Sequence, residues 1–324
     1  GGMQLLHMEH DDPYEKTLPK VTQFVLEIFI IYSSLTFICG LCYFVGGMNG
    51  FDAVAHAMTT ISTGGFSTHN SSFATFNSEK IETISIFFMI IGSLPFVIYL
   101  KTLHGDWKSL YKDEQVKLFF ILIITLIFFT TLWLLLYSEQ NFLNTLRISS
   151  FNIISILTGT GYTSANYNFW GGFGLIIMFI IMFIGGCAGS TTGGVKIFRL
   201  QLLFKAALTQ IKKLTQPHGV FVTLFNKKTV AEETFNSIMG FFFIYILVFI
   251  LSAILLSFTG LDFITALSGS ASAISNVGPG LGSIIGPNAN YSIIPLEAKW
   301  ILLITMLIGR LELFTFLVIL SVTF

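Results

Sequence analysis

Apolar residues fill six long stretches of this sequence, separated by short polar connections. The stretches lie at about 24–46, 83–100, 116–137, 171–205, 235–258 and 300–323. Each is near or above the roughly 18–20 residues that a helix needs to cross the hydrocarbon core of a bilayer. The pattern predicts an all-α membrane protein with six spans.

Composition supports this class, and the distribution of charge orients the chain. Hydrophobic residues make up 53% of the 324 positions and charged residues only 10%, which is more apolar surface than a soluble core of this length can bury. Basic residues outnumber acidic ones in 196–233 and recur in 101–117, so the positive-inside rule makes both segments cytoplasmic. The connections at 47–82, 138–170 and 259–299 then face outward.

The three outward connections share one design. Each begins with a residue able to cap a helix, continues for about 12–16 moderately apolar residues, and ends in a glycine-rich segment. The capping candidates are Asn49 or Asp52, Asn141 and Asp262, and the glycine-rich segments are "STGGF" at 62–66, "TGTGY" at 158–162 and "SNVGP" at 275–279. A helix of this length is too short to span a bilayer, so we expect three re-entrant pore helices within three repeated units.

The glycine-rich segments predict a path for a cation. Non-helical backbone at membrane depth is tolerated where it lines a cavity or is buried in protein, and glycine lets successive carbonyl oxygens face a passing ion. The three five-residue segments contain no Asp or Glu, which favours carbonyl coordination of a dehydrated monovalent ion. The alternative is that they are ordinary Gly/Ser turns, but three matched copies on one side favour a pore.

Five motifs together resemble one family. "ISTGGFSTHN", "ILTGTGYTSAN", "ISNVGPGLGS", "GGCAGSTTGGVK" at 185–196 and "IGRLELFT" at 308–315 resemble the Trk/Ktr superfamily of potassium-uptake membrane subunits, most closely the bacterial TrkH type. The resemblance implies four repeats around one pseudo-fourfold pore in the bacterial inner membrane. It also implies a homodimer, a cytosolic nucleotide-binding regulatory subunit of the TrkA type, no nucleic-acid partner, and no cofactor apart from the transported K⁺.

The same resemblance assigns roles to residues. The filter positions are Ser62, Thr63, Gly64, Gly65, Thr158, Gly159, Thr160, Gly161, Ser275, Asn276, Val277 and Gly278, with potassium at Gly65, Gly161 and Gly278. The gate positions are Gly185, Gly186, Gly189, Gly193, Gly194 and Arg310. Glycines and hydroxyl residues interrupt a helix readily, and an arginine inside a span usually faces a cavity.

We expect six segments along the chain. They are a cytoplasmic N-terminal segment at 1–21, repeat one at 22–100, a cytoplasmic linker at 101–115, repeat two at 116–205 with a broken helix at 185–194, a basic cytoplasmic linker at 206–234, and repeat three at 235–324. The resembling family has four repeats, so three correspond to an incomplete fragment that lacks the first. We expect such a chain not to form a selective pore by itself.

Two other functions remain open from the residues alone. A secondary transporter with broken helices is one, although three re-entrant helices on one face argue against it. A membrane-embedded enzyme is the other, and it is disfavoured because His69 has no Asp or Glu close in sequence to orient it. Selectivity between K⁺ and Na⁺ is not determined by these residues, since carbonyl filters select through geometry.

Overall fold

The computed structural model describes residues 21–137 and 141–311, and within them the chain is almost entirely helical. Three of the described helices are long and apolar enough to cross a membrane, or four if one bent pair counts as a single span. The three are α2 (Val21–Val45), α7 (Glu114–Tyr137) and α11 (Glu232–Phe258). The prediction of an all-α membrane protein is confirmed.

Each long helix is followed by a short one that cannot span a bilayer. These are α3 (Gly50–Ile61), α8 (Phe142–Leu157) and α12 (Phe263–Ser275). The Asn49 side chain caps α3 by accepting from the amide of Asp52 at 2.8 Å. Asp262 caps α12 by accepting from the Thr265 amide at 3.2 Å, whereas Asn141 occupies the same position before α8 without a side-chain cap bond.

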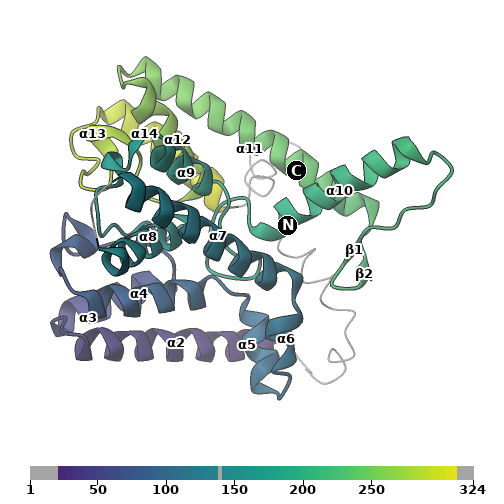
Figure 1. The fold of residues 1–324 in the computed structure, drawn as a ribbon, viewed down its shortest axis with the longest axis horizontal. Coiled ribbons are helices and arrows are strands. Elements are labelled where there is room, and N and C mark those ends of the chain that lie inside the picture. The colour runs from purple at the N-terminus through teal and green to yellow at the C-terminus, as the bar shows by residue number, and fades with distance from the viewer. Residues whose placement is uncertain (1–20, 138–140, 312–324) are drawn as a thin grey trace.

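The predicted span at 83–100 is not one continuous helix. The segment forms two helices, α4 (Glu79–Gly92) and α5 (Phe96–Leu103), bent by 88° with respect to each other. Pro95 lies at the bend, and a proline has no amide hydrogen and restricts the residue before it, so the helix cannot continue. In Figure 1, α4 runs beside α2, and α5 packs against α2, where the rings of Tyr32 and Phe96 are 6.2 Å apart.

The second helices of the other two units are also limited in length. In the 171–205 stretch, α9 (Gly171–Ile181) ends well before α10 (Ile197–Thr215) begins, and the chain between them is irregular. In the last stretch, α14 covers Leu296–Arg310, and positions 312–324 lie outside the described residues. Short elements complete the fold: α6 (Lys108–Lys112), α13 (Gly282–Ile285), and the 3₁₀ turns η2 (Ser72–Thr75) and η3 (Tyr167–Phe169).

A small structured arm occupies the basic region that we expected to be a linker. Helix α10 runs without interruption through the expected boundary at 205/206 and projects from the body in Figure 1. It is followed by a hairpin of β1 (Leu224–Phe225) and β2 (Lys228–Thr229). The Lys205 ammonium donates to the Glu114 carboxylate and to the Leu224 carbonyl at 2.7 Å, which ties α10, the start of α7 and the hairpin together.

In this fold many large apolar side chains are exposed and many hydroxyl side chains are buried, which is the opposite of what soluble proteins show. Large apolar side chains such as Phe29, Phe128 and Phe243 are 60–70% exposed on α2, α7 and α11. By contrast, the hydroxyls of α12 at Ser268, Ser270, Ser272 and Ser275 are buried. An apolar exterior around polar pore helices is stable when the surroundings are lipid.

Candidate functional site: the glycine-rich loops and the break below them

The three glycine-rich loops lie next to one another although they are far apart in sequence. A methyl group placed on Gly65 would lie 1.6 Å from the carbonyl oxygen of Thr160. A methyl group on Gly161 would lie 1.8 Å from the carbonyl oxygen of Val277. The first loop therefore touches the second, and the second touches the third. At Gly278 a methyl group meets nothing within 4 Å among the described residues.

The loops have the same backbone pattern. Positive φ angles occur at the second and fourth positions of each loop. The residues are Thr63 (50°) and Gly65 (66°), Gly159 (71°) and Gly161 (81°), and Asn276 (56°) and Gly278 (110°). A left-handed conformation costs about 1–2 kcal/mol for most residues with a β-carbon, so Thr63 holds its geometry against a local preference, whereas Asn is commonly found in this conformation at the end of a helix. Because the second loop position has a positive φ angle whether it is Thr, Gly or Asn, the surrounding structure sets this backbone conformation.

Backbone amides in the loops donate back into the pore helix that precedes them. The Gly64 amide donates to the Thr59 carbonyl at 2.8 Å, and the Gly161 amide donates to the Ser155 carbonyl at 3.1 Å. The Val277 amide donates to the Ser272 carbonyl at 2.9 Å.

The carbonyl oxygens of the loops behave differently from the amides. Within the described residues, no hydrogen bond ends on the backbone oxygens of 63–65, 158–161 or 275–277. The carbonyls at the loop ends do accept hydrogen bonds. Their donors are Thr63 Oγ1 at Ser62, the Tyr291 hydroxyl at Gly278, Thr59 Oγ1 at Phe66 and the Ser155 hydroxyl at Tyr162. Gly64 is exposed and Gly65 and Gly161 are partly exposed, so these oxygens are open to water or to a cation.

The hydroxyls of three buried tyrosines contact hydroxyl side chains of the pore helices α3 and α12. The Tyr162 hydroxyl lies 2.6 Å from Thr59 Oγ1, and its ring packs 4.3 Å from the ring of Phe73. Tyr43 reaches Thr60 Oγ1 at 2.9 Å, and Tyr245 reaches the Ser275 hydroxyl at 2.7 Å. Sequence reasoning missed these three residues, because a tyrosine in an apolar stretch gives no signal of which helix its hydroxyl meets.

His69 has a carboxylate partner that lies 17 residues earlier in the sequence. Asp52, in the first turn of α3, places Oδ2 at 3.1 Å from His69 Nε2 because the loop after α3 returns to the start of that helix. The buried His56 contacts the Asp52 backbone carbonyl and the Ser67 hydroxyl, at 2.8 Å and 3.0 Å. The histidine beside Ser67 therefore faces a backbone carbonyl instead of a carboxylate, and these residues do not form a nucleophile–base–carboxylate series.

The predicted gate residues lie together beneath the loops. The Arg310 guanidinium donates to the Thr191 carbonyl at 3.2 Å. The Thr191 hydroxyl donates to the carbonyls of Ile61 and Gly92, at 2.9 Å and 3.0 Å. A methyl group on Gly193 would lie 2.7 Å from the Ser275 carbonyl. The 182–196 loop thus contacts the ends of the first and third pore helices as well as Arg310.

The remaining predicted gate glycines shape the loop itself. Gly185 and Gly194 have φ angles of 77° and pack against each other, and Gly189 accepts a hydrogen bond from the Phe96 amide at 3.0 Å. Gly186 lies against the Thr192 side chain, whose hydroxyl accepts from the Gly186 amide at 3.2 Å. The bend at 92–96 and the loop are therefore one contiguous structure.

A repeated motif marks this level of the fold and was not used in the sequence interpretation. Met-x-Ile-Gly occurs at 89–92, 182–185 and 306–309. A methyl group would lie 3.0 Å from the Ile61 carbonyl at Gly92 and 2.0 Å from the Ile274 carbonyl at Gly309. Both carbonyls belong to the last turn of a pore helix, so these glycines allow the second helix of a unit to approach it closely. The threefold Met-x-Ile-Gly repeat could therefore have predicted these close helix contacts from the sequence.

These features define a class: an α-helical membrane protein built from repeated units of long helix, re-entrant helix, glycine-rich loop and second helix. The profile of the TrkH family, described as cation transport protein, matches residues 2–324. The chain belongs to the TrkH family.

Relatives of known name and structure are similar over nearly the whole chain. The potassium uptake protein TrkI of Halomonas elongata is 38% identical over 100% of this chain and 66% of its own length. TrkH of Escherichia coli K12 is 35% identical over 100% of this chain and 67% of its own length. The crystal structure of the potassium transporter TrkH from Vibrio parahaemolyticus matches with a TM-score of 0.88 at 32% identity, over 94% of this chain and 65% of that one.

The chain thus spans about two thirds of the length of the relatives it matches. Its relatives are named as transport proteins, which excludes the membrane-embedded enzyme as the family's activity. The chain is a multi-pass protein of the bacterial inner membrane.

Proposed function

We propose that this chain forms part of a pore that moves potassium ions across the membrane through its glycine-rich loops. The observation that carries the proposal is a difference between the amide and carbonyl groups of the loop backbone. The amides of Gly64, Gly161 and Val277 donate into their own pore helices, and the neighbouring carbonyl oxygens accept no hydrogen bond among the described residues. Carbonyl oxygens in that state replace the water around a dehydrated cation.

The assignment of individual filter positions rests on the resemblance and on the shared backbone geometry. Positive φ angles at the second and fourth loop positions support equivalent roles for Gly65, Gly161 and Gly278 as the places where potassium passes. The C-terminal ends of α3, α8 and α12 all lead into these loops, and a helix C-terminus carries partial negative charge that favours a nearby cation.

The 182–196 loop and Arg310 form the barrier in this proposal. The hydrogen bond from Arg310 to the Thr191 carbonyl keeps a positive charge beside the loop that contacts the pore-helix ends. A positive charge opposes the passage of a cation in a medium of low dielectric constant. Conduction then requires the guanidinium and the loop to move away from the path.

Two partner assignments follow the family resemblance and belong to the same proposal. One is a second copy of the chain, giving a homodimer, and the other is a cytosolic nucleotide-binding subunit of the TrkA type. The projecting arm of α10 and the hairpin supports a cytosolic contact, because it extends beyond the membrane-spanning helices and carries the basic side chains Lys212, Lys213 and Lys227.

Flux measurements in proteoliposomes test the proposal. The chain is reconstituted by itself and also fused behind the upstream segment of the Vibrio parahaemolyticus protein, and uptake of rubidium and sodium is followed without any added substrate. We expect the fused protein to admit rubidium faster than sodium and the chain by itself to lack this discrimination. Absence of rubidium uptake in both preparations, with intact folding, would refute conduction. Equal selective uptake in both would refute the need for a fourth repeat.

A further inference from the structure

The hairpin of β1 and β2 is attached to the start of α7. Its two turn residues, Asn226 and Lys227, have φ angles of 47° and 66°, as a two-residue hairpin turn requires. The Asn226 side chain accepts from the Glu114 amide at 2.9 Å and donates to the Asp113 carboxylate at 2.9 Å. The Asn226 amide donates to the Glu114 carboxylate at 3.2 Å. The turn is therefore hydrogen-bonded to two consecutive residues where α7 begins.

The same turn of α7 also holds the 182–196 loop. The Asp113 carboxylate caps the helix, since it accepts from the amides of Gln115 and Val116 at 2.8 Å and 3.1 Å. The buried Gln115 side chain accepts from the Ala188 amide of the loop at 2.9 Å. The hairpin and the loop are therefore bonded to adjacent residues of one helix end.

Apolar side chains connect the hairpin to the loop a second time. Ala188 is buried in one cluster with Phe225 of β1 and with Val230, which follows β2. Phe198 and Leu202 of α10 belong to the same cluster, and the rings of Phe198 and Phe225 are 4.8 Å apart in a T-shaped contact. Polar and apolar contacts from the hairpin region thus converge on the same residue of the loop.

We propose that Asn226 and Gln115 are positioning residues that hold the 182–196 loop beneath the glycine-rich loops, so that the cytoplasmic hairpin sets how readily this loop moves away. The inference rests on the proposed role of the loop as the barrier. The loop has another attachment at the α4–α5 bend, where the Cys187 amide donates to the Ser93 carbonyl at 3.1 Å. The Asn226 bonds are exposed, and exposed hydrogen bonds open at a lower free-energy cost than buried ones. The hairpin contact is therefore the attachment that is released first.

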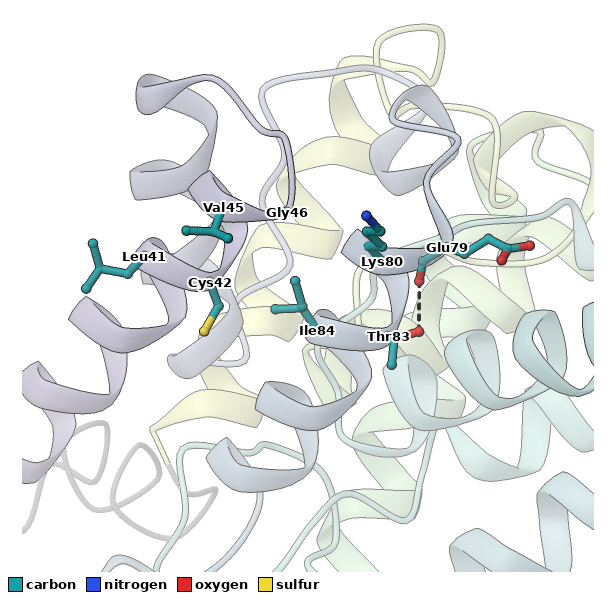
Figure 2. A pocket seen from close by; sticks show the side chains of 8 residues that line it. All are labelled: Leu41, Cys42, Val45, Gly46, Glu79, Lys80, Thr83 and Ile84. Carbon is teal, nitrogen blue, oxygen red and sulfur yellow. Dashed lines mark hydrogen bonds between the residues drawn. The ribbon is translucent and has the colours of Figure 1, made fainter.

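The chain contains its own reporter for movement of the loop. Cys187 has a free thiol, precedes Ala188, and is fully buried while the loop is in place. Cys39 is fully buried in α2, away from the loop, and reacts only when the fold opens. Cys42 is partly exposed and lines an open groove between α2 and α4, as Figure 2 shows, so its thiol gives a reference rate. Comparison of the three thiols separates release of the loop from unfolding.

The test measures the rate at which N-ethylmaleimide modifies each cysteine of the purified chain in mild detergent, followed by mass spectrometry. Asn226→Gly removes the side-chain bonds to α7, and glycine adopts a φ of 47° readily, so the turn is kept. We expect this variant to raise the Cys187 rate, relative to the Cys42 rate, by about fivefold, because two exposed hydrogen bonds are lost. Cys39 should stay unmodified.

Lys227→Gly is the matched control for the turn. Lys227 is the adjacent turn residue with a φ of 66°, and its side chain makes no hydrogen bond among the described residues. The Cys187 rate should therefore not rise in this variant. Gln115→Met keeps the length of the side chain but removes the acceptor of the Ala188 amide. We expect it to raise the Cys187 rate by about tenfold, because a buried amide loses its partner.

Two results would overturn the proposal. One is an equal Cys187 rate in Asn226→Gly and Lys227→Gly while Cys39 stays unmodified, which would separate the hairpin from the loop. The other is an unchanged Cys187 rate in Gln115→Met. Basal rubidium flux in the extended protein keeps this inference distinct from the proposed function: a faster Cys187 rate with unchanged flux supports the positioning of the loop by the hairpin and contradicts the loop as the barrier.

Discussion

Replacing Gly65 with alanine should force the first and second loops apart. The added methyl group would lie 1.6 Å from the Thr160 carbonyl oxygen and 2.8 Å from the Thr160 carbonyl carbon. Ordinary contact begins near 3.4 Å, so the two backbones must separate by about 1.8 Å. The neighbouring atom is backbone, which cannot rotate out of the way as a flexible side chain does.

The expected loss of stability has two parts. Holding alanine at a φ of 66° costs about 1–2 kcal/mol, and overpacking a buried contact costs about 1–3 kcal/mol more. Gly65→Ala should therefore lower the free energy of unfolding by about 2–5 kcal/mol. Gly159→Ala is the matched control, because its φ is 71° and its methyl group would meet nothing closer than 3.9 Å. Only the conformational part, about 1–2 kcal/mol, applies there.

The unfolding of each variant can be followed in detergent with a thiol-reactive fluorescent dye, since Cys39 becomes accessible only when the fold opens. Rubidium and sodium flux in the extended protein gives the second readout, and Gly65→Ala should discriminate less between the two ions than Gly159→Ala. A Gly65→Ala variant that is as stable and as selective as Gly159→Ala would refute the close contact between the loops.

Three further predictions test the barrier and the buried polar contacts. Arg310→Ala should raise basal rubidium flux by removing the charge beside Thr191, while Arg310→Lys should keep flux low; equal flux in both variants contradicts an electrostatic barrier. Arg147→Met leaves the buried Glu82 carboxylate without its partner at 3.4 Å and should cost about 3–5 kcal/mol in unfolding free energy. Adding Glu82→Leu should recover part of that loss, and a strictly additive double variant would argue against the pairing. Tyr162→Phe should cost about 1–3 kcal/mol in the same unfolding assay, because it removes the hydroxyl partner of Thr59, and a neutral result would contradict that contact.

The sequence by itself determined the membrane class, the family and the positions of the short helices. Hydrophobic length and capping residues act over short windows, so Asn49 and Asp262 mark the starts of α3 and α12 without knowledge of the rest of the chain. The roles given to the loop and gate residues stay predictions. Pro95 was a local signal for the 88° bend between α4 and α5. The sequence interpretation did not use this proline and therefore treated 83–100 as one continuous helix.

Only the tertiary structure decided which distant groups meet. Nothing near Gly65 in sequence identifies the Thr160 carbonyl as its neighbour, and nothing near His69 identifies Asp52 as its partner. Thr63 adopts a positive φ angle that its side chain disfavours, because hydrogen bonds from the loop to its pore helix hold the backbone there. Such contacts depend on the packing of whole helices, and the energy that selects them comes from burial and hydrogen bonding between segments that a local pattern does not connect.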